Sequence, residues 1–317
     1  GHGQSFISKH SFDHQINTVQ MSFSDWLFDT VDRLQSDPSA KNIEIALRKL
    51  WAGLLGRFVP EQQEEQVVWD EDWDILVILD GCRADAMEEI IQGTSYQSLF
   101  ADSKLETRWS VGGTSFEWMQ KTFNEKYSAE IEETAYITGN PYTDQIQYDE
   151  FSEFTHFGIA STEYDIRTVS PRKLTDQAIN TWRKRDEKGV DRMIVHYMQP
   201  HAPFRSRPEW FREFKGTKKF GSKVWWRLCD GTVSHDDFWT AYIDNLEWIL
   251  EEVSILSTSI DGSIALTADH GNAKGEWGVY GHPKGVPVSA VREVPWITLD
   301  GIDTEEYTPE YNVSDSG

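Results

Sequence analysis

Short apolar runs separated by longer mixed segments are the feature that most constrains how this 317-residue chain can fold. The run Trp73–Leu79 reads WDILVIL, and Met193–Tyr197, Ser263–Thr267 and Val294–Leu299 are similar. A half-buried strand would alternate apolar and polar residues, whereas an almost uninterrupted apolar run is typical of a strand buried on both faces. The runs therefore predict the central strands of a parallel sheet.

Helical stretches lie between these runs, at Ala84–Gln92, Phe116–Phe123, Leu174–Lys184 and Asp237–Leu256. Strands that alternate with helices are typical of α/β domains, in which helices cover both faces of the sheet. We expect a three-layer α/β/α sandwich with a mostly parallel central sheet. In such a sheet, ligands bind beyond the carboxyl ends of the strands.

The composition predicts four parts along the chain. Residues 1–21 lack the apolar centre of a signal peptide, and we expect a leader or a remnant of expression there. Residues 22–66 are expected to form an N-terminal helical segment. The main α/β domain spans residues 67–303, and an acidic tail follows at 304–317.

The second helix of the N-terminal segment has two possible roles. Its sequence places Arg48 and Lys49 beside Trp51, a combination found on helices that lie on membrane surfaces. The alternative, which we favour at this point, is a helix packed on the main domain.

The charge balance excludes several classes of partner. The chain has 53 acidic and 30 basic residues and a net charge of −23, so it repels phosphate backbones and is not expected to bind nucleic acid. A surplus of this size is typical of a high-salt cytoplasm, as in halophilic archaea, and we expect a cytoplasmic protein. Two cysteines cannot build a disulfide framework, and no run of 18 apolar residues predicts a transmembrane helix. The oligomeric state stays open.

Ionisable side chains follow three of the predicted strands. Asp80 comes directly after the first run, His201 follows the second, and Asp269-His270 follows the third. Because the carboxyl ends of parallel strands meet at one edge, we expect these groups to lie close together. Carboxylate oxygens and imidazole nitrogens are ligands for divalent metals, so the sequence predicts a metal site at this edge.

A pair of hydroxyl groups stands before the predicted helix Phe116–Phe123. Two glycines, Gly112 and Gly113, permit a tight turn, and Thr114 and Ser115 follow them. A hydroxyl at a helix N-terminus lies where the helix dipole favours an anion. Either residue could be a nucleophile, and either could instead only cap the helix.

These motifs together resemble a known family. The segments are Asp80-x-x-Arg83-Ala84-Asp85, His201-Ala202-Pro203-Phe204, Asp269-His270-Gly271 and Gly281-His282-Pro283. In this order they look like the sulfatase-like branch of the alkaline phosphatase superfamily, over roughly residues 70–300. The Thr-Ser stretch is similar to the nucleophile segment of lipoteichoic acid synthases and phosphoethanolamine transferases. The resemblance implies an alkaline-phosphatase-like α/β/α fold and a catalytic domain at residues 67–303.

The resemblance also implies roles for individual residues. Carried onto this sequence, the ligands of one metal ion are Asp80, Thr114, Asp269 and His270, with Thr114 as the nucleophile and Ser115 as the second choice. The remaining residues that it assigns contact the substrate or support the site: His201, His282 and Arg83. We add Ser115 and Lys284 as substrate-binding candidates.

Two departures from the family pattern narrow the chemistry. Sulfatases carry a Cys/Ser-x-Pro-x-Arg motif that this chain lacks, because Cys82 and Cys229 stand in other contexts. Relatives with two metals place an Asp where this chain has Tyr197, so we expect a single ion. We expect Mn²⁺, with Zn²⁺, Mg²⁺ and Ca²⁺ as alternatives.

The sequence therefore favours a metal-dependent phosphoester hydrolase or phosphotransferase that forms a covalent phospho-enzyme. The expected substrate is a small molecule or a glycan- or lipid-linked phosphodiester or phosphomonoester. The alternatives are a catalytically degenerate sulfatase-like protein that binds a glycan or partner, and a sulfuric ester hydrolase.

Overall fold

The computed structural model describes residues 40–58, 65–93, 95–96, 98–146, 149–162, 164–211 and 222–311. The predicted leader and the first predicted helix lie outside the described residues. The chain divides into two compact units, residues 1–50 and residues 51–317. Helix α2 (Ala40–Phe58) crosses this boundary, and the first unit is described only by the beginning of α2.

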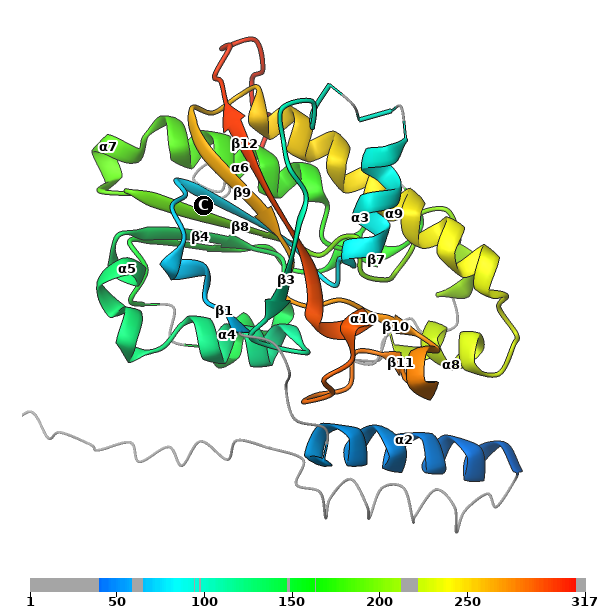
Figure 1. Ribbon diagram of the computed structural model, residues 1–317. Coiled ribbons are helices and arrows are strands. Elements are labelled where there is room, and N and C mark those ends of the chain that lie inside the picture. Colours follow the sequence, from blue (N-terminus) through cyan, green and yellow to red (C-terminus); the bar gives the residue numbers. More distant parts are fainter. Residues whose placement is uncertain are drawn as a thin grey trace, which may run out of the picture. The chain divides into compact units, whose positions relative to one another are not determined.

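An eight-stranded sheet forms the centre of the second unit, with strand order β1-β3-β12-β9-β2-β8-β4-β5 (Figure 1). Its strands are β1 (Glu65–Gln66), β2 (Ile75–Leu79), β3 (Glu106–Ser110), β4 (Thr134–Thr138), β5 (Glu153–His156), β8 (Arg192–Tyr197), β9 (Gly262–Thr267) and β12 (Glu293–Gly301). All neighbours pair in parallel except β12, which runs antiparallel to β3 and to β9. The mostly parallel sheet predicted from the apolar runs is confirmed, and the fourth predicted strand is its reversed member.

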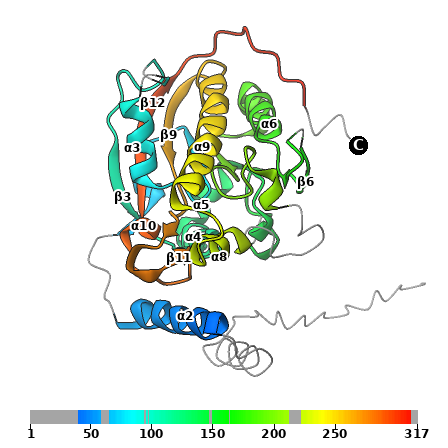
Figure 2. The same cartoon turned by 90° about the vertical axis from the view of Figure 1, so that its right-hand side faces the viewer.

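Helices cover both faces of the sheet, which makes the predicted three layers. On one face lie α3 (Ala84–Gln92), α6 (Pro171–Arg183) and α9 (His235–Ser257), and α6 and α9 stand in front of the sheet in Figure 2. On the other face lie α4 (Ser115–Thr122) and α5 (Ser128–Glu132). The shorter elements are α7 (Arg185–Lys188), α8 (Ser222–Cys229), α10 (Ser289–Arg292), the hairpin of β10 (Ala273–Lys274) and β11 (Tyr280–Gly281), and the pair β6 (Ala160–Ser161) and β7 (Arg167–Thr168).

Strand β2 shows why its sequence is apolar throughout. Successive side chains of a strand point to opposite faces. Ile75, Val77 and Leu79 pack in the core beneath α3, α6 and α9, whereas Leu76 and Ile78 pack in the core beneath α4 and α5. All five are fully buried, so every position of the strand requires an apolar residue.

One buried carboxylate takes part in holding the described part of the acidic tail to the domain. Asp176 on α6 accepts hydrogen bonds from the Tyr307 hydroxyl at 2.6 Å and from the backbone amides of Glu310 and Tyr311 at 3.0 and 3.1 Å. The side chain of Asp176 is fully buried, so these three donors satisfy it.

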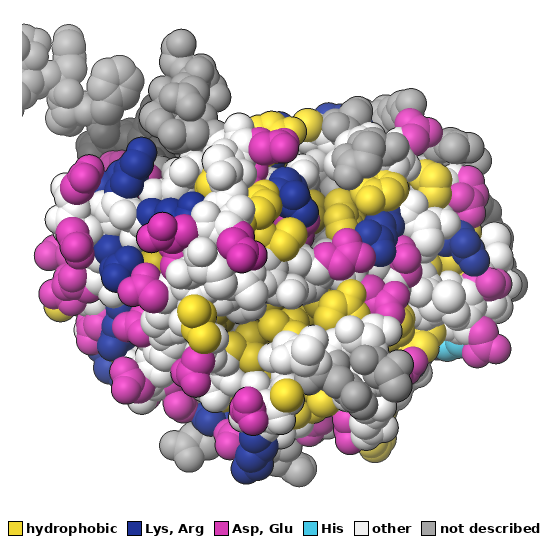
Figure 3. Space-filling model, turned by 90° about the horizontal axis from the view of Figure 1, so that it is seen from above, with side chains coloured by type: hydrophobic (Ala, Val, Ile, Leu, Met, Phe, Trp, Pro, Cys, Tyr) yellow, Lys and Arg dark blue, Asp and Glu magenta, His cyan; other side chains and the backbone are white. Residues whose placement is uncertain are grey.

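Charged side chains of both signs are spread over the face seen in Figure 3, where Asp and Glu lie among Lys and Arg. Basic side chains of the domain form ion pairs with acidic ones, as in Arg183–Asp303 and Arg185–Asp261. Within the described residues, no helix combines the length and the apolar character needed to cross a membrane.

Candidate active site

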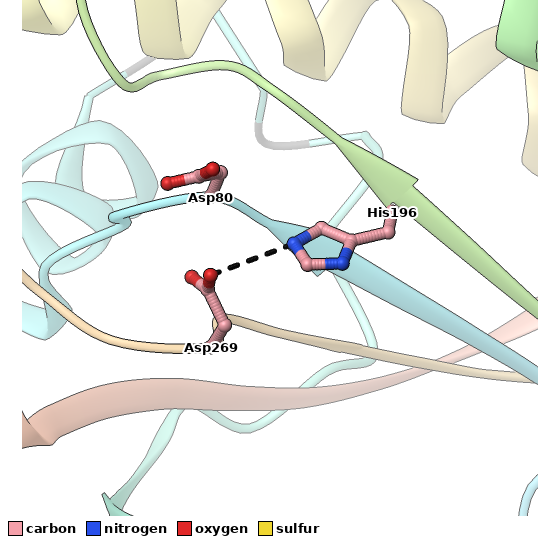
Figure 4. A group of neighbouring side chains, drawn as sticks. All are labelled: Asp80, His196 and Asp269. Carbon is pink, nitrogen blue, oxygen red and sulfur yellow. Dashed lines mark ion pairs between the residues drawn. The ribbon is translucent and has the colours of Figure 1, made fainter. Parts of the chain in front are cut away.

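Polar side chains from several strands meet at the carboxyl edge of the sheet. β2 lies between β8 and β9, so the residues that follow β2 and β9 come together there. Asp80 follows β2, Asp269 lies two residues after β9, and His196 is the fifth residue of β8. Figure 4 shows the two carboxylates and the imidazole pointing toward one another. All three side chains are buried.

Asp80 uses only one of its two carboxylate oxygens. Its Oδ2 accepts a hydrogen bond from Asn140 Nδ2 at 3.1 Å and from Ser115 Oγ at 3.4 Å. Its Oδ1 has no hydrogen-bond partner and is buried. The chain can turn away directly after Asp80 because Gly81 has a φ of +69°, a conformation that residues with a Cβ rarely adopt.

Asp269 shows the same division between its oxygens. Its Oδ1 accepts hydrogen bonds from the backbone amides of Gly81 at 3.0 Å and of His270 at 2.9 Å. Its Oδ2 forms no hydrogen bond, although it lies 3.5 Å from His196 Nε2 and 3.6 Å from His270 Nε2. Both carboxylates are therefore oriented by one oxygen and present the other to the centre of the site.

His270 presents a lone pair to the same centre. Its Nδ1 lies 2.8 Å from the carbonyl oxygen of Gly271, and because a carbonyl can only accept, Nδ1 carries the hydrogen. Its Nε2 then has no hydrogen in the neutral ring and lies 3.6 Å from Asp80 Oδ1. A ring nitrogen fixed by a backbone carbonyl, with the other nitrogen directed at the ion, is the usual arrangement of a metal-binding histidine. In this structure that second nitrogen lies 3.4 Å from the Ser115 hydroxyl.

The donor set fits a divalent cation. Asp80, His196 and Asp269 each offer a ligand atom within 4.8 Å of the others, and the free atom of each of the three has no hydrogen-bond partner. Burial and the neighbouring Asp269 raise the pKa of Asp80 well above its usual value. Burial acts in the same direction on Asp269, but His270 and His196 outweigh it and hold the pKa of Asp269 below its usual range. Two buried carboxylates at this separation are unfavourable without a cation, so these residues could hold a metal ion.

The two candidate hydroxyls have different surroundings. The Thr114 side chain accepts a hydrogen bond from the backbone amide of Glu117 and caps the N-terminus of α4. The Ser115 hydroxyl is buried and lies 3.4 Å from both Asp80 Oδ2 and His270 Nε2. The structure thus places the second-choice residue, Ser115, beside the carboxylate and imidazole atoms that could hold a metal ion, and Thr114 caps the helix.

His201 and His282 form a pair next to this centre. Their Nε2 atoms are 3.1 Å apart, and the ring of His282 stacks on that of His270 with centroids 4.2 Å apart. The Nδ1 of His201 lies 2.8 Å from the Ala202 carbonyl and must donate to it, so the His282 Nε2–H donates to the His201 Nε2. Burial and the nearby His270 lower the pKa of His201 to about 4, and burial lowers the pKa of His282 as well. Both rings are therefore neutral at pH 7.

Arg83 contacts residues around the site and not Asp80 itself. Its guanidinium binds Asp85 at 2.7 Å and Glu276 at 2.8 Å, and donates to the carbonyl of Asn272 at 2.6 Å. These bonds tie the turn after β2 to the loop after β9. Lys284 is exposed and lies two residues after His282.

Two residues of the site, Asn140 and His196, were not predicted from the sequence. Asn140 follows β4, a short apolar run of the same kind as the others, so the signal was present in the sequence Thr134–Thr138. His196 lies inside an apolar run, and its sequence position alone indicates a core residue. The Tyr136 hydroxyl lies 3.0 Å from its Nδ1 and holds the ring in place.

No family model matches the chain, and no curated protein matches it. Solved structures similar to it include the soluble domain of lipooligosaccharide phosphoethanolamine transferase A from Neisseria meningitidis. The two share 12% identity, with 73% of this chain and 77% of that chain covered and a TM-score of 0.44.

Two further solved structures are similar to this chain to about the same extent. The C-terminal periplasmic domain of the phosphoethanolamine transferase EptC from Campylobacter jejuni has 16% identity, covers 71% of this chain and 77% of its own, and has a TM-score of 0.42. A 2-O GAG sulfatase has 10% identity, covers 71% of this chain and 63% of its own, and has a TM-score of 0.44. At these identities and TM-scores the likenesses carry no argument about this chain, and its chemistry has to follow from its own side chains.

Proposed function

We propose that this chain is a metal-dependent hydrolase or transferase of phosphoesters, with Ser115 as its nucleophile. The observation that carries the proposal is the position of the Ser115 hydroxyl, which lies 3.4 Å from both Asp80 Oδ2 and His270 Nε2, in a site whose two carboxylates each keep one buried oxygen free. A hydroxyl in contact with an acceptor and with metal-ligating groups matches the arrangement of an activated nucleophile.

The residues that would hold the metal are Asp80, Asp269 and His270, with His196 as a further candidate. When bound, a divalent ion there lowers the pKa of a neighbouring hydroxyl and stabilises negative charge on the oxygens of the transferred group. Asp80 Oδ2 accepts the hydrogen bond of the Ser115 hydroxyl, and Asn140 keeps that carboxylate in place by donating to the same oxygen.

Ser115 attacks the phosphorus and forms a phospho-serine as the leaving oxygen departs. Ser115 is the first residue of α4, and the N-terminus of a helix favours a phosphoryl group through its dipole and free amides. The His201–His282 pair is neutral and carries one Nε2–H, which can donate a hydrogen bond to the leaving oxygen in place of His201 Nε2, and the leaving oxygen takes its proton from solvent. Water or a sugar hydroxyl then takes the phosphoryl group, which decides between hydrolysis and transfer.

The nucleophile is tested by replacing each hydroxyl separately. Ser115→Ala should lower turnover of an aryl phosphodiester or monoester by at least about a thousandfold, because no second hydroxyl occupies its position. Thr114→Ala is the matched control, since it removes a neighbouring hydroxyl that only caps α4. It should cost about 1 kcal/mol of stability and leave turnover within a few-fold.

The covalent intermediate gives an independent readout. Rapid quenching during turnover, followed by peptide mass spectrometry, should place a phosphoryl group on Ser115. The same assay with an aryl sulfate measures the preference between ester classes. Full turnover in Ser115→Ala, or a phosphoryl group on Thr114, would show that the assignment of the nucleophile is wrong.

A further inference from the structure

The hydroxyl of Ser110 joins two segments of the site. Ser110 is the last residue of β3 and is buried. Its Oγ donates a hydrogen bond to the carbonyl oxygen of Asp269 and accepts one from the backbone amide of Gly112 at 3.2 Å. Ser110 and Asp269 are 159 positions apart in the sequence, so one side chain connects the turn before α4 to the loop after β9. Residues 110–113 are called the glycine turn below, and residues 269–271 the Asp269 loop.

Two basic side chains hold the carbonyl groups of the glycine turn. Arg292 donates from Nε and Nη2 to the carbonyl oxygen of Ser110, at 2.9 and 2.7 Å. Lys121 donates from Nζ to the carbonyl oxygen of Val111 at 2.6 Å. Both cations also bind Glu65 Oε1, at 2.8 and 2.9 Å. Arg292 is fully buried, and a guanidinium in such a position requires partners of this kind.

The glycine turn is also fixed to α4. The amide of Gly113 donates a hydrogen bond to Glu117 Oε2 at 3.1 Å. A Cβ on Gly112 would lie 2.4 Å from the Trp118 amide nitrogen, so the turn passes very close to the helix. Ser115 is the first residue of α4, and its position therefore depends on where the glycine turn lies.

The sheet itself does not join the glycine turn to the Asp269 loop. β3 and β9 are not neighbours, because β12 lies between them. On one side α10 holds both segments, since the Gly271 amide donates to the Val291 carbonyl at 2.7 Å and the next residue is Arg292. The Ser110 hydroxyl adds a direct hydrogen bond from the one segment to the other.

We propose that Ser110 is a positioning residue for the reaction at this site. Its hydroxyl sets the distance between Ser115 and the side chains of Asp269 and His270, and it acts through the backbone of the two segments. The proposal rests on the proposed function, in which Ser115 attacks the phosphorus. A displacement of about 1 Å in a reacting group can cost about a hundredfold in rate. Loss of the Ser110 hydroxyl should therefore lower kcat and leave KM almost unchanged, because no group that contacts the substrate is removed.

The first experiment compares Ser110→Ala with the wild type on p-nitrophenyl phosphate and bis(p-nitrophenyl) phosphate. At saturating Mn²⁺, so that weaker metal binding does not contribute, kcat should fall by about tenfold to a hundredfold while KM changes by less than about threefold. Ser259→Ala is the matched control, because Ser259 is also buried and its hydroxyl has no hydrogen-bond partner within the described residues. It should keep kcat within about twofold of the wild type.

Hydrogen exchange followed by mass spectrometry tests the link between the segments without any reaction. In the metal-free wild type, the Gly112 amide is protected by its hydrogen bond to the Ser110 hydroxyl. In Ser110→Ala, a peptide that covers the glycine turn should exchange at least about tenfold faster, whereas a peptide that covers β2 should exchange as in the wild type. Ser259→Ala should leave both peptides unchanged. Circular dichroism melting shows that both variants are folded.

Three results would overturn the proposal. The first is a kcat of Ser110→Ala within about twofold of the wild type, and the second is an equal loss of kcat in Ser259→Ala. The third is unchanged exchange in the glycine turn of Ser110→Ala, since the hydroxyl would then not hold the turn. A failure of the proposed function gives a different result, because the wild type itself would turn over neither ester and Ser110 would have no reaction to support.

Discussion

Replacing Asp80 with Asn should separate the stability of the domain from its affinity for a metal. In the metal-free protein, the free oxygens of Asp80 and Asp269 belong to a group whose ligand atoms lie within 4.8 Å. Two unit charges at 4.8 Å repel by about 3.5 kcal/mol at an effective dielectric constant of about 20. We therefore expect metal-free Asp80→Asn to be at least as stable as the wild type.

Although metal-free Asp80→Asn should be at least as stable as the wild type, it should gain less stability from metal. At a free Mn²⁺ concentration of about 100 times Kd, binding adds about 2.7 kcal/mol to the stability of the wild type. For a domain of this size, each kcal/mol raises Tm by about 2–4 °C, so the melting temperature should rise by about 5–11 °C. Asp80→Asn removes the negative charge that would bind the ion, and its Tm should rise by less than about 2 °C.

Differential scanning fluorimetry of chelator-treated protein, with and without Mn²⁺, measures both quantities. Asp72→Asn is the matched control, because Asp72 is an exposed carboxylate that makes none of the contacts of the site. It should behave as the wild type does. If metal-free Asp80→Asn melts more than about 5 °C below the wild type and its rise in Tm with Mn²⁺ is undiminished, Asp80 neither repels Asp269 in the metal-free protein nor binds the ion.

Three further outcomes follow from the same contacts. In metal-free protein, folding raises the pKa of Asp80, so the unfolded chain loses this proton at lower pH than the folded one. The stability of the wild type relative to Asp80→Asn should therefore fall as pH rises above 4. Urea unfolding at pH 4, 5 and 7 measures this difference, and a rise would contradict the prediction. Gly112→Ala brings a Cβ to 2.4 Å from the Trp118 amide nitrogen and displaces the start of α4, so it should cost about 1–3 kcal/mol of stability and at least tenfold in turnover. Gly53→Ala is the control, because its Cβ would lie in open space and should not destabilise the protein. Equal effects of the two substitutions would argue against this. Asp176→Ala leaves three donors of the tail without their acceptor, so the free energy of unfolding in urea should fall by about 1–3 kcal/mol. A change below about 0.5 kcal/mol would contradict a stabilising role of these hydrogen bonds.

The sequence predicted the part of the site that depends on the ends of buried strands. Runs buried on both faces leave little choice of structure, and the first residues after them must lie at one edge of the sheet. On that ground alone Asp80, Asp269 and His270 could be expected to lie close together, and they do. His282, which was named only from the family resemblance, lies beside His201 and His270.

The sequence could not decide between Thr114 and Ser115. Adjacent residues at a helix start point in directions about 100° apart, and the extended backbone of Thr114 turns its side chain onto the Glu117 amide. Only the backbone angles at that one residue decide which hydroxyl faces Asp80. The same holds for His196, because a position within a strand does not say whether the ring reaches the end of the sheet.

The antiparallel direction of β12 could not be predicted from the sequence either. The run Val294–Leu299 is as apolar as those of the parallel strands, and its burial does not depend on its direction. The length of the connection does not fix the direction either, because the segment 268–292 between β9 and β12 is long enough for a parallel crossover.

The distribution of the site along the chain has a consequence for how the protein matures. Asp80, Ser115, Asn140, His196 and Asp269 belong to five different strand–helix units, and the first and last are separated by nearly two hundred residues. A nascent chain therefore cannot bring these side chains together until the segment that ends in His270 has been synthesised and β9 has joined β2. A metal ion that needs this group of ligands could bind only after those strands have paired.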